Sequence, residues 1–146
     1  MLRYVIIVLV ALGVVPGVAA GWSEHWTATS NTAISITGDV TLYSDRMALA
    51  GGKTLPIHKV RNLPIADPAG FKGLATLYRV APPADPVLLR GNRICGTGAV
   101  TFVVIWHSAP MAAGDRPGRA FAAFTGQAEP AGLGGACATF YYSYGA

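Results

Sequence analysis

The order of apolar and polar positions along this chain is mostly that of β-strands. Short runs rich in β-branched and aromatic residues are separated by turn residues, and few stretches sustain a helical period. The first two runs, residues 32–36 and 40–43, flank a Thr-Gly-Asp turn and predict a β-hairpin. Alternation then predicts one buried face made by four apolar residues: Ile34, Ile36, Val40 and Leu42.

A second hairpin is predicted from residues 46–49 and 54–60, which flank Gly51-Gly52. This interpretation also accounts for Gly52-Lys53-Thr54, a triplet that closes the phosphate-binding loop of many nucleotide-binding proteins. Such a loop needs its first glycine at a position where this chain has Met47. The residues after the triplet alternate instead of beginning a helix, so we expect no nucleotide site.

The strongest strand signal is at residues 100–107, where both faces are apolar, as is typical of the centre of a sheet. Residues 61–73 contain two prolines and two glycines, and we expect a long connection there. A turn is expected at residues 81–86. The remaining strands are predicted at residues 74–80, 87–90, 119–126 and 137–144.

Eight or nine short strands with regular turn signals indicate a single all-β domain. A closed barrel would leave no exposed strand edge, which is an advantage for a secreted protein. We therefore expect a small antiparallel barrel or a two-sheet sandwich of about eight strands.

The first twenty residues have the composition of a secretory signal peptide. Arg3 precedes an apolar run at residues 5–15, and the small residues Val18 and Ala20 stand where a signal peptidase cleaves. The run is shorter than the roughly 20 residues that a membrane-spanning helix needs. We expect residues 1–20 to be removed and residues 21–146 to form the domain, with no membrane span after cleavage. The alternative is an uncleaved amino-terminal anchor.

The two cysteines, Cys95 and Cys137, are the only ones in the chain. An even number of cysteines in an exported chain usually forms disulfides. The chain has no C-x-x-C pair, the motif that would indicate a redox function. We therefore predict a Cys95–Cys137 disulfide and a periplasmic or secreted location.

The charge of the mature chain is mildly basic. Without Arg3, ten Lys and Arg face seven Asp and Glu, a net charge of +3 with neutral His. This balance suits an anionic protein or an envelope component as partner, but it lacks the clustered basic stripe of a nucleic-acid-binding protein.

Catalytic chemistry has few candidates in this sequence. The three histidines, His25, His58 and His107, fit no metal-ligand spacing, and no serine lies in a G-x-S-x-G motif. We therefore expect no catalytic residue, metal or other cofactor. Aspartates in or beside turns usually cap the backbone, and this explanation suits five of them: Asp39, Asp45, Asp67, Asp85 and Asp115.

Aromatic residues gather near both ends of the mature chain. Trp22 and Trp26 near its start could line a carbohydrate or peptide groove together with three tyrosines near its end, Tyr141, Tyr142 and Tyr144. The alternative, which we favour, is that the two ends pair and bury alternate rings.

Arginines beside the predicted disulfide are a second candidate binding site. Arg90, Asn92 and Arg93 lie in a loop that the disulfide would hold rigid. Together with Arg116 and Arg119 from a later loop, they could form a basic patch for an anionic partner. Equally, these arginines could serve only solubility.

These features favour a secreted or periplasmic binding protein without catalytic activity. It could inhibit an exported hydrolase or contact the cell envelope, although this expectation rests on fold analogy. Two alternatives are a carrier that holds a small apolar ligand in the barrel interior and a hydrolase without a recognisable motif.

Overall fold

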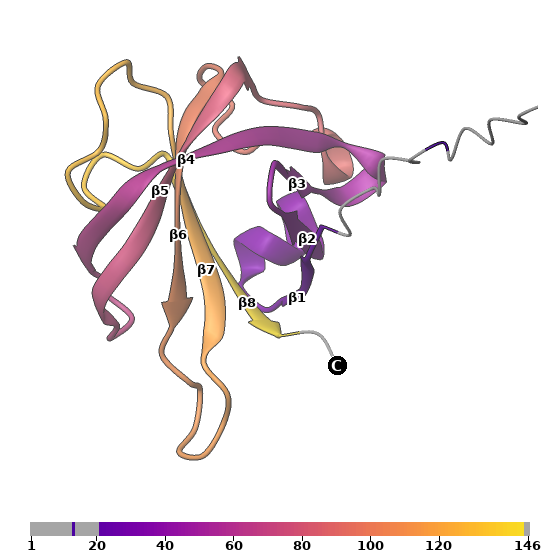
Figure 1. Cartoon of the computed structure of the whole chain (residues 1–146). Coiled ribbons are helices and arrows are strands. Elements are labelled where there is room, and N and C mark those ends of the chain that lie inside the picture. Colours follow the sequence, from indigo (N-terminus) through magenta and orange to yellow (C-terminus); the bar gives the residue numbers. More distant parts are fainter. Residues whose placement is uncertain (1–12, 14–20, 145–146) are drawn as a thin grey trace, which may run out of the picture.

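The structure, a computed structural model, is a closed barrel of eight antiparallel strands (Figure 1). The strands follow one another around the barrel in chain order, and β8 pairs with β1 to close it. Of the two expected architectures, the barrel is therefore confirmed. The strands are β1 Ser23–Ala28, β2 Val40–Tyr43, β3 Arg46–Ala48, β4 Thr54–Ala66, β5 Lys72–Ala84, β6 Val100–Ser108, β7 Gly118–Phe124 and β8 Ala138–Tyr144.

The structure describes Gly13 and residues 21–144. Apart from Gly13, the signal peptide predicted at residues 1–20 lies outside the described residues. Within the part of the chain that is described, no helix is long and apolar enough to cross a membrane.

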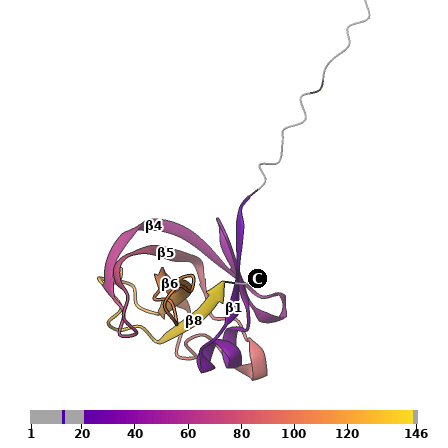
Figure 2. The same ribbon diagram turned by 90° about the horizontal axis from the view of Figure 1, so that it is seen from below.

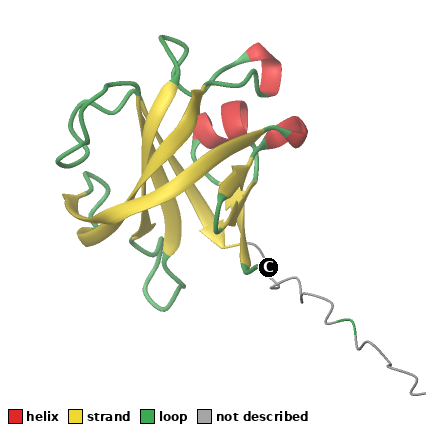
Figure 3. Cartoon of the chain, turned by 45° about the horizontal axis from the view of Figure 1, so that its top comes forward, coloured by secondary structure: helices red, strands yellow, loops and turns green. Residues whose placement is uncertain are grey.

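The connections between strands alternate between the two ends of the barrel, because consecutive strands are antiparallel. One end, which we call the helical end, carries three short helical turns (Figure 3). These are η1 Ala33–Thr37, η2 Ala50–Gly52 and η3 Leu89–Gly91. The opposite end carries the β4–β5 turn and the β6–β7 loop, residues 109–117.

Apolar side chains from all eight strands fill the barrel interior. Trp26, Phe121 and Phe140 are completely buried there. The rings of Phe121 and Phe140 stack with their centroids 4.7 Å apart, within the range of favourable aromatic pairs. The pairing of β1 with β8 confirms that the two ends of the domain come together and bury alternate rings.

A second apolar core lies on the outer face of β6 and β7. Figure 2 shows how β4 and β5 curve around β6, so that the far part of their hairpin covers this face. A bulge between Lys59 and Arg61 makes the arrangement possible. Because side chains alternate with a period of two, one extra residue reverses the face of all that follow. Leu63 and Ile65 therefore join the second core.

The predicted disulfide is confirmed. Cys95, in the β5–β6 connection, bonds to Cys137, which directly precedes β8, with 5.4 Å between their Cα atoms. A disulfide is typical of an oxidising, extracellular-type compartment. The hairpin around Gly51 and Gly52 is also confirmed, and both glycines have the positive φ that favours this residue.

The first predicted hairpin is wrong, because residues 33–37 form the helical turn η1 instead of a strand. The carbonyl oxygen of Ser30 accepts a hydrogen bond from the Ile34 amide, and its hydroxyl oxygen accepts one from the Ala33 amide. Ala33 and Thr37 are buried at helical spacing, whereas Ile34 is exposed. β2 pairs with β1 in place of this segment.

Two further expectations about strands are corrected. Residues 61–73 are not a long connection, since β4 and β5 extend through most of them. Pro64 is tolerated because β3 pairs only with Thr54–Pro56, which leaves the far part of β4 with one partner strand. The strand predicted at residues 87–90 is instead a loop with η3, and β5 continues into the turn predicted at residues 81–86.

Candidate functional site

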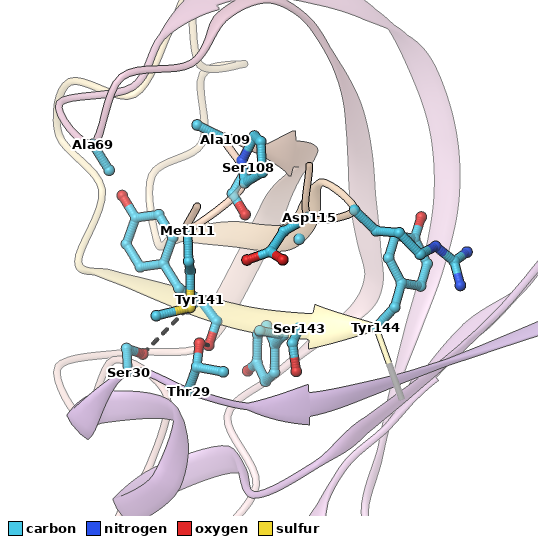
Figure 4. A pocket seen from close by; sticks show the side chains of 14 residues that line it. Thr29, Ser30, Ala69, Ser108, Ala109, Met111, Asp115, Tyr141, Ser143 and Tyr144 are labelled. Atoms are coloured by element: carbon cyan, nitrogen blue, oxygen red, sulfur yellow. Dashed lines mark hydrogen bonds between the residues drawn. The ribbon is translucent and has the colours of Figure 1, made fainter. Parts of the chain in front are cut away.

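A groove of about 810 Å³ lies along the outer face of β8. We call it the β8 groove; its volume is within the usual range of ligand sites. In Figure 4, Asp115 lies between Tyr141 and Tyr144. The lining residues are Thr29, Ser30, Ala69, Ser108, Ala109, Pro110, Met111, Asp115, Arg116, Gly118, Tyr141, Tyr142, Ser143 and Tyr144.

Alternation along β8 positions the floor of the groove. Phe140 and Tyr142 point into the barrel interior and are buried. Tyr141 and Ser143 therefore point outward and are only partly buried. After the end of β1, the backbone amides of Thr29 and Ser30 both donate to the Tyr141 carbonyl oxygen, so this segment forms one wall.

The ring of Tyr141 is held by a buried carboxylate. Its hydroxyl donates to Asp67 Oδ1 at 2.7 Å, and the indole nitrogen of Trp106 donates to Asp67 Oδ2 at 3.0 Å. Asp67 lies in the β4–β5 turn and is only 6% exposed. Burial and the hydrogen bond to Asp67 raise the pKa of Tyr141. The phenol therefore keeps its proton, and its hydrogen bond to Asp67 restrains the ring that lines the groove.

The β6–β7 loop forms the opposite wall. Met111 in this loop is 88% exposed, and a thioether side chain packs readily against varied surfaces. The guanidinium carbon of Arg116 lies 4.9 Å from the centre of the Tyr144 ring, in cation–π contact. The groove thus combines aromatic, thioether, hydroxyl and charged groups.

Gly118 permits the close packing of β7 under this wall. A Cβ atom at this position would overlap the carbonyl oxygen of Tyr142 and lie 2.6 Å from Ser108 Oγ. The backbone oxygen belongs to β8 and cannot move without disturbing the sheet.

We expect Gly118→Ala to lower the free energy of unfolding by about 1–3 kcal/mol, because the methyl group overpacks this contact. Urea denaturation followed by circular dichroism measures the effect. Gly98→Ala is the matched control, since nothing lies within 4 Å of a Cβ there. Equal stability of the two variants would contradict the proposed steric role.

An ion pair between Glu24 and Arg119 lies beside Gly118, and both side chains are largely buried. Arg119 donates through Nε and Nη2 to the two carboxylate oxygens, and Trp26 donates its indole N–H to Oε1 at 2.7 Å. Burial alone would raise the pKa of Glu24, but the hydrogen bonds from Arg119 and Trp26 lower it below 4.5. The Arg119 guanidinium is therefore bound to Glu24 inside the protein.

The lowered pKa of Glu24 predicts acid sensitivity. The unfolded chain binds this proton more readily, so the stabilisation is complete above pH 4.5 and is lost as the pH falls through the folded-state pKa. We expect Glu24→Gln to be less stable at neutral pH and to lose less stability below pH 4.5. Thermal unfolding of both proteins from neutral pH to below pH 4.5 measures this difference in acid sensitivity. Glu129→Gln, which removes a more exposed carboxylate, is the control. Equal acid sensitivity of wild type and Glu24→Gln would contradict the prediction.

The residues predicted around the disulfide lie at the helical end. The Asp85 carboxylate organises their loop, and Arg93 donates to the Asp85 carbonyl oxygen. Asn92 donates to the carbonyl oxygen of Ser35. Arg90 is exposed, with a φ of +55°, and its binding role stays a prediction. Asp85 accepts hydrogen bonds from three backbone amides: Ile94, Cys95 and Gly96.

The other predicted binding residues are distributed differently. Arg116 and Arg119 lie at the end opposite to Arg90 and Arg93, so the four arginines do not form one basic patch. Trp22 is exposed, whereas Trp26 belongs to the interior core. Of the predicted binding residues, Arg116 alone lines the β8 groove, but all three tyrosines named with the tryptophans line it.

Several groove residues carry no signal in the sequence. Met111 and Asp115 lie in a loop without a motif, and Ser143 differs from other strand serines only through its neighbours in space. Asp67 has a turn context that explains its bond to the Ala69 amide, but not its contacts with Trp106 and Tyr141. Among the described residues, no group of three side chains is placed to hold a metal ion.

Comparison with known proteins identifies no family for this chain. No family model matches the sequence, and neither a curated protein nor a solved structure is significantly similar to it.

Proposed function

We propose that this chain is an exported, non-catalytic binding protein that contacts the cell envelope, and that its contact site is the β8 groove. The observation that carries the proposal is the groove itself, a concave surface with a fixed tyrosine ring on a closed barrel. Such pre-organisation favours binding, because little conformational entropy is lost when a ligand is captured.

Export is supported by the disulfide and by the composition of residues 1–20. Mass spectrometry of protein purified from its native source should give a chain that begins at Gly21 and carries an oxidised Cys95–Cys137 pair. An intact leading Met together with two free thiols would contradict export.

The protonation states near the groove favour binding over acid–base catalysis. A general acid or base works best when its pKa lies near the operating pH. The pKa of Tyr141 is raised and that of Glu24 is lowered, so both shifts move away from neutrality. Internal hydrogen bonds contribute to both shifts, and the bond from Tyr141 to Asp67 also restrains a residue that lines the groove.

The groove also supports the proposal better than the barrel interior does. The interior is occupied by large side chains, including Trp26, Phe121 and Tyr142. A carrier would need space for its ligand there.

The test is to block the groove and measure capture of partners. Ser143→Arg places a long cation on the floor of the groove, and Gln127→Arg adds the same charge to an exposed loop at the helical end. Immobilised wild type and Gln127→Arg should retain the same components of an envelope extract, and Ser143→Arg should lose them. Identical retention by all three proteins would overturn the proposal. If the retained component is a hydrolase, the chain is an inhibitor instead of a structural contact.

A further inference from the structure

We infer that the ligand of the β8 groove is an uncharged carbohydrate chain. This inference rests on the proposed function and adds to it the chemical class of the ligand. It is based on four features of the groove: its charge, the way its aromatic ring is fixed, its polar groups, and the strand pairing around it.

The charge of the groove differs from that of the whole chain. Its lining contains one carboxylate, Asp115, and one guanidinium, Arg116, which balance each other. The chain as a whole carries a net charge of +4. Electrostatic complementarity therefore favours a neutral ligand for this surface over an anionic one.

The aromatic floor suits a ring-shaped ligand with an apolar face. Tyr141 packs edge to face against Trp106, with 6.3 Å between the ring centres, and Asp67 holds its hydroxyl. These two contacts fix the ring, which lines the groove. Sugar rings present C–H groups on one face, and these pack well against a rigid aromatic surface.

The polar groups of the groove suit the hydroxyl groups of such a ligand. The Asp115 carboxylate can accept two hydroxyl hydrogen bonds, and Arg116 can donate several. Asp115 and Arg116 line the same groove as Tyr141, so a ligand stacked on this ring would lie within reach of both charged groups. A chain of sugar units offers hydroxyl groups to both of these side chains.

Strand pairing argues against an extended peptide as the ligand. Peptides often bind by adding a strand to an exposed sheet edge. β8 pairs with β7 on one side and with β1 on the other, and the Tyr141 carbonyl oxygen is already bonded to residues 29 and 30. The floor of the groove therefore offers side chains instead of a free backbone edge.

The inference can be tested by NMR titration of the mature domain with neutral cello-, malto- and chito-oligosaccharides. A proline-rich peptide is the competing probe, because such peptides also dock on aromatic grooves. We expect one of the oligosaccharides to shift the amide signals of residues 108–118 and 141–144. Asp115→Ala should weaken this binding about tenfold, the loss of one charged hydrogen bond. Asp45→Ala, an exposed carboxylate outside the groove, should leave it unchanged.

The outcomes separate the ligand class from the proposed function. Absence of shifts with every oligosaccharide, or shifts only with the peptide, would overturn the carbohydrate inference. The proposed function would survive that result if Ser143→Arg still abolished capture from the envelope extract. If an oligosaccharide shifted only amide signals outside the β8 groove, and did so equally in Asp115→Ala and wild type, the groove would not be its binding site.

Discussion

Replacing both cysteines by serine should lower the free energy of unfolding by about 4 kcal/mol. Cys95 and Cys137 are 42 positions apart, and loop-closure entropy gives this value for a cross-link of that span. The bond also joins the Asp85-organised loop to the start of β8, whose side chains form the groove floor. The loss can be measured by urea denaturation of the Cys95→Ser/Cys137→Ser variant.

Reduction of the wild type supplies an independent control for this prediction. A reducing agent should lower the stability of the wild type to that of the double variant, which the agent should not affect. A difference below about 1 kcal/mol between oxidised wild type and the double variant would contradict the prediction, since disulfides of this span usually contribute 2–4 kcal/mol.

Removal of the Asp67 carboxylate should cost about 3 kcal/mol and also open the groove. Asp67→Ala leaves the buried Trp106 indole N–H and the partly buried Tyr141 hydroxyl without their acceptor, and loss of an acceptor in a buried site costs about 1–3 kcal/mol. The Tyr141 ring would then be free to change its orientation. Denaturation measures the first effect, and amide NMR signals of residues 141–144 report the second.

Asp39→Ala is the matched control for Asp67→Ala. Its carboxylate accepts the amide of Ala28, but its side chain is more than half exposed, so we expect a loss below about 1 kcal/mol. Asp67→Asn should be intermediate, because an amide keeps one acceptor oxygen. Equal losses in Asp67→Ala and Asp39→Ala would show that Asp67 is an ordinary turn residue.

The strands with clear alternation or strong apolar character could be predicted from the sequence. Residues 100–107 have two apolar faces, and the structure shows why, since one face lines the barrel and the other meets the second core. The disulfide can be predicted from the even number of cysteines together with the expectation of export. These features depend on local pattern or on counting.

The errors arose where tertiary contacts override local signals. Two prolines and two glycines at residues 61–73 suggested a break, but the far part of β4 needs hydrogen bonds on one side only. The isoleucines at residues 34 and 36 suggested alternation, but Ser30 caps a helical turn through its hydroxyl and carbonyl oxygens. Neither the missing partner strand nor the cap is visible in a pattern of apolar residues.

The candidate site could be predicted only in part. Tyr141, Tyr142 and Tyr144, which the less favoured of two interpretations placed in a groove, line the β8 groove, while Trp22 and Trp26 lie elsewhere. The binding role of these residues stays a prediction. The groove needs Asp67 from one hairpin and Asp115 from another, and these are far from β8 in sequence. The fold of the β4–β5 hairpin over the outer face of β6 and β7 brings Asp67 to Tyr141, and the pairing of β7 with β8 brings the β6–β7 loop beside β8.

Because of the bulge at Val60, a change in the length of β4 should disturb the fold more than a change of one of its side chains. Before this residue, odd-numbered positions face the barrel interior, and after it they face the second core. Exchanging one side chain does not change which face each position occupies. Deleting one residue would turn Leu63 and Ile65 away from the second core to the other face of the sheet. During divergence, this hairpin should therefore accept substitutions far more readily than insertions or deletions.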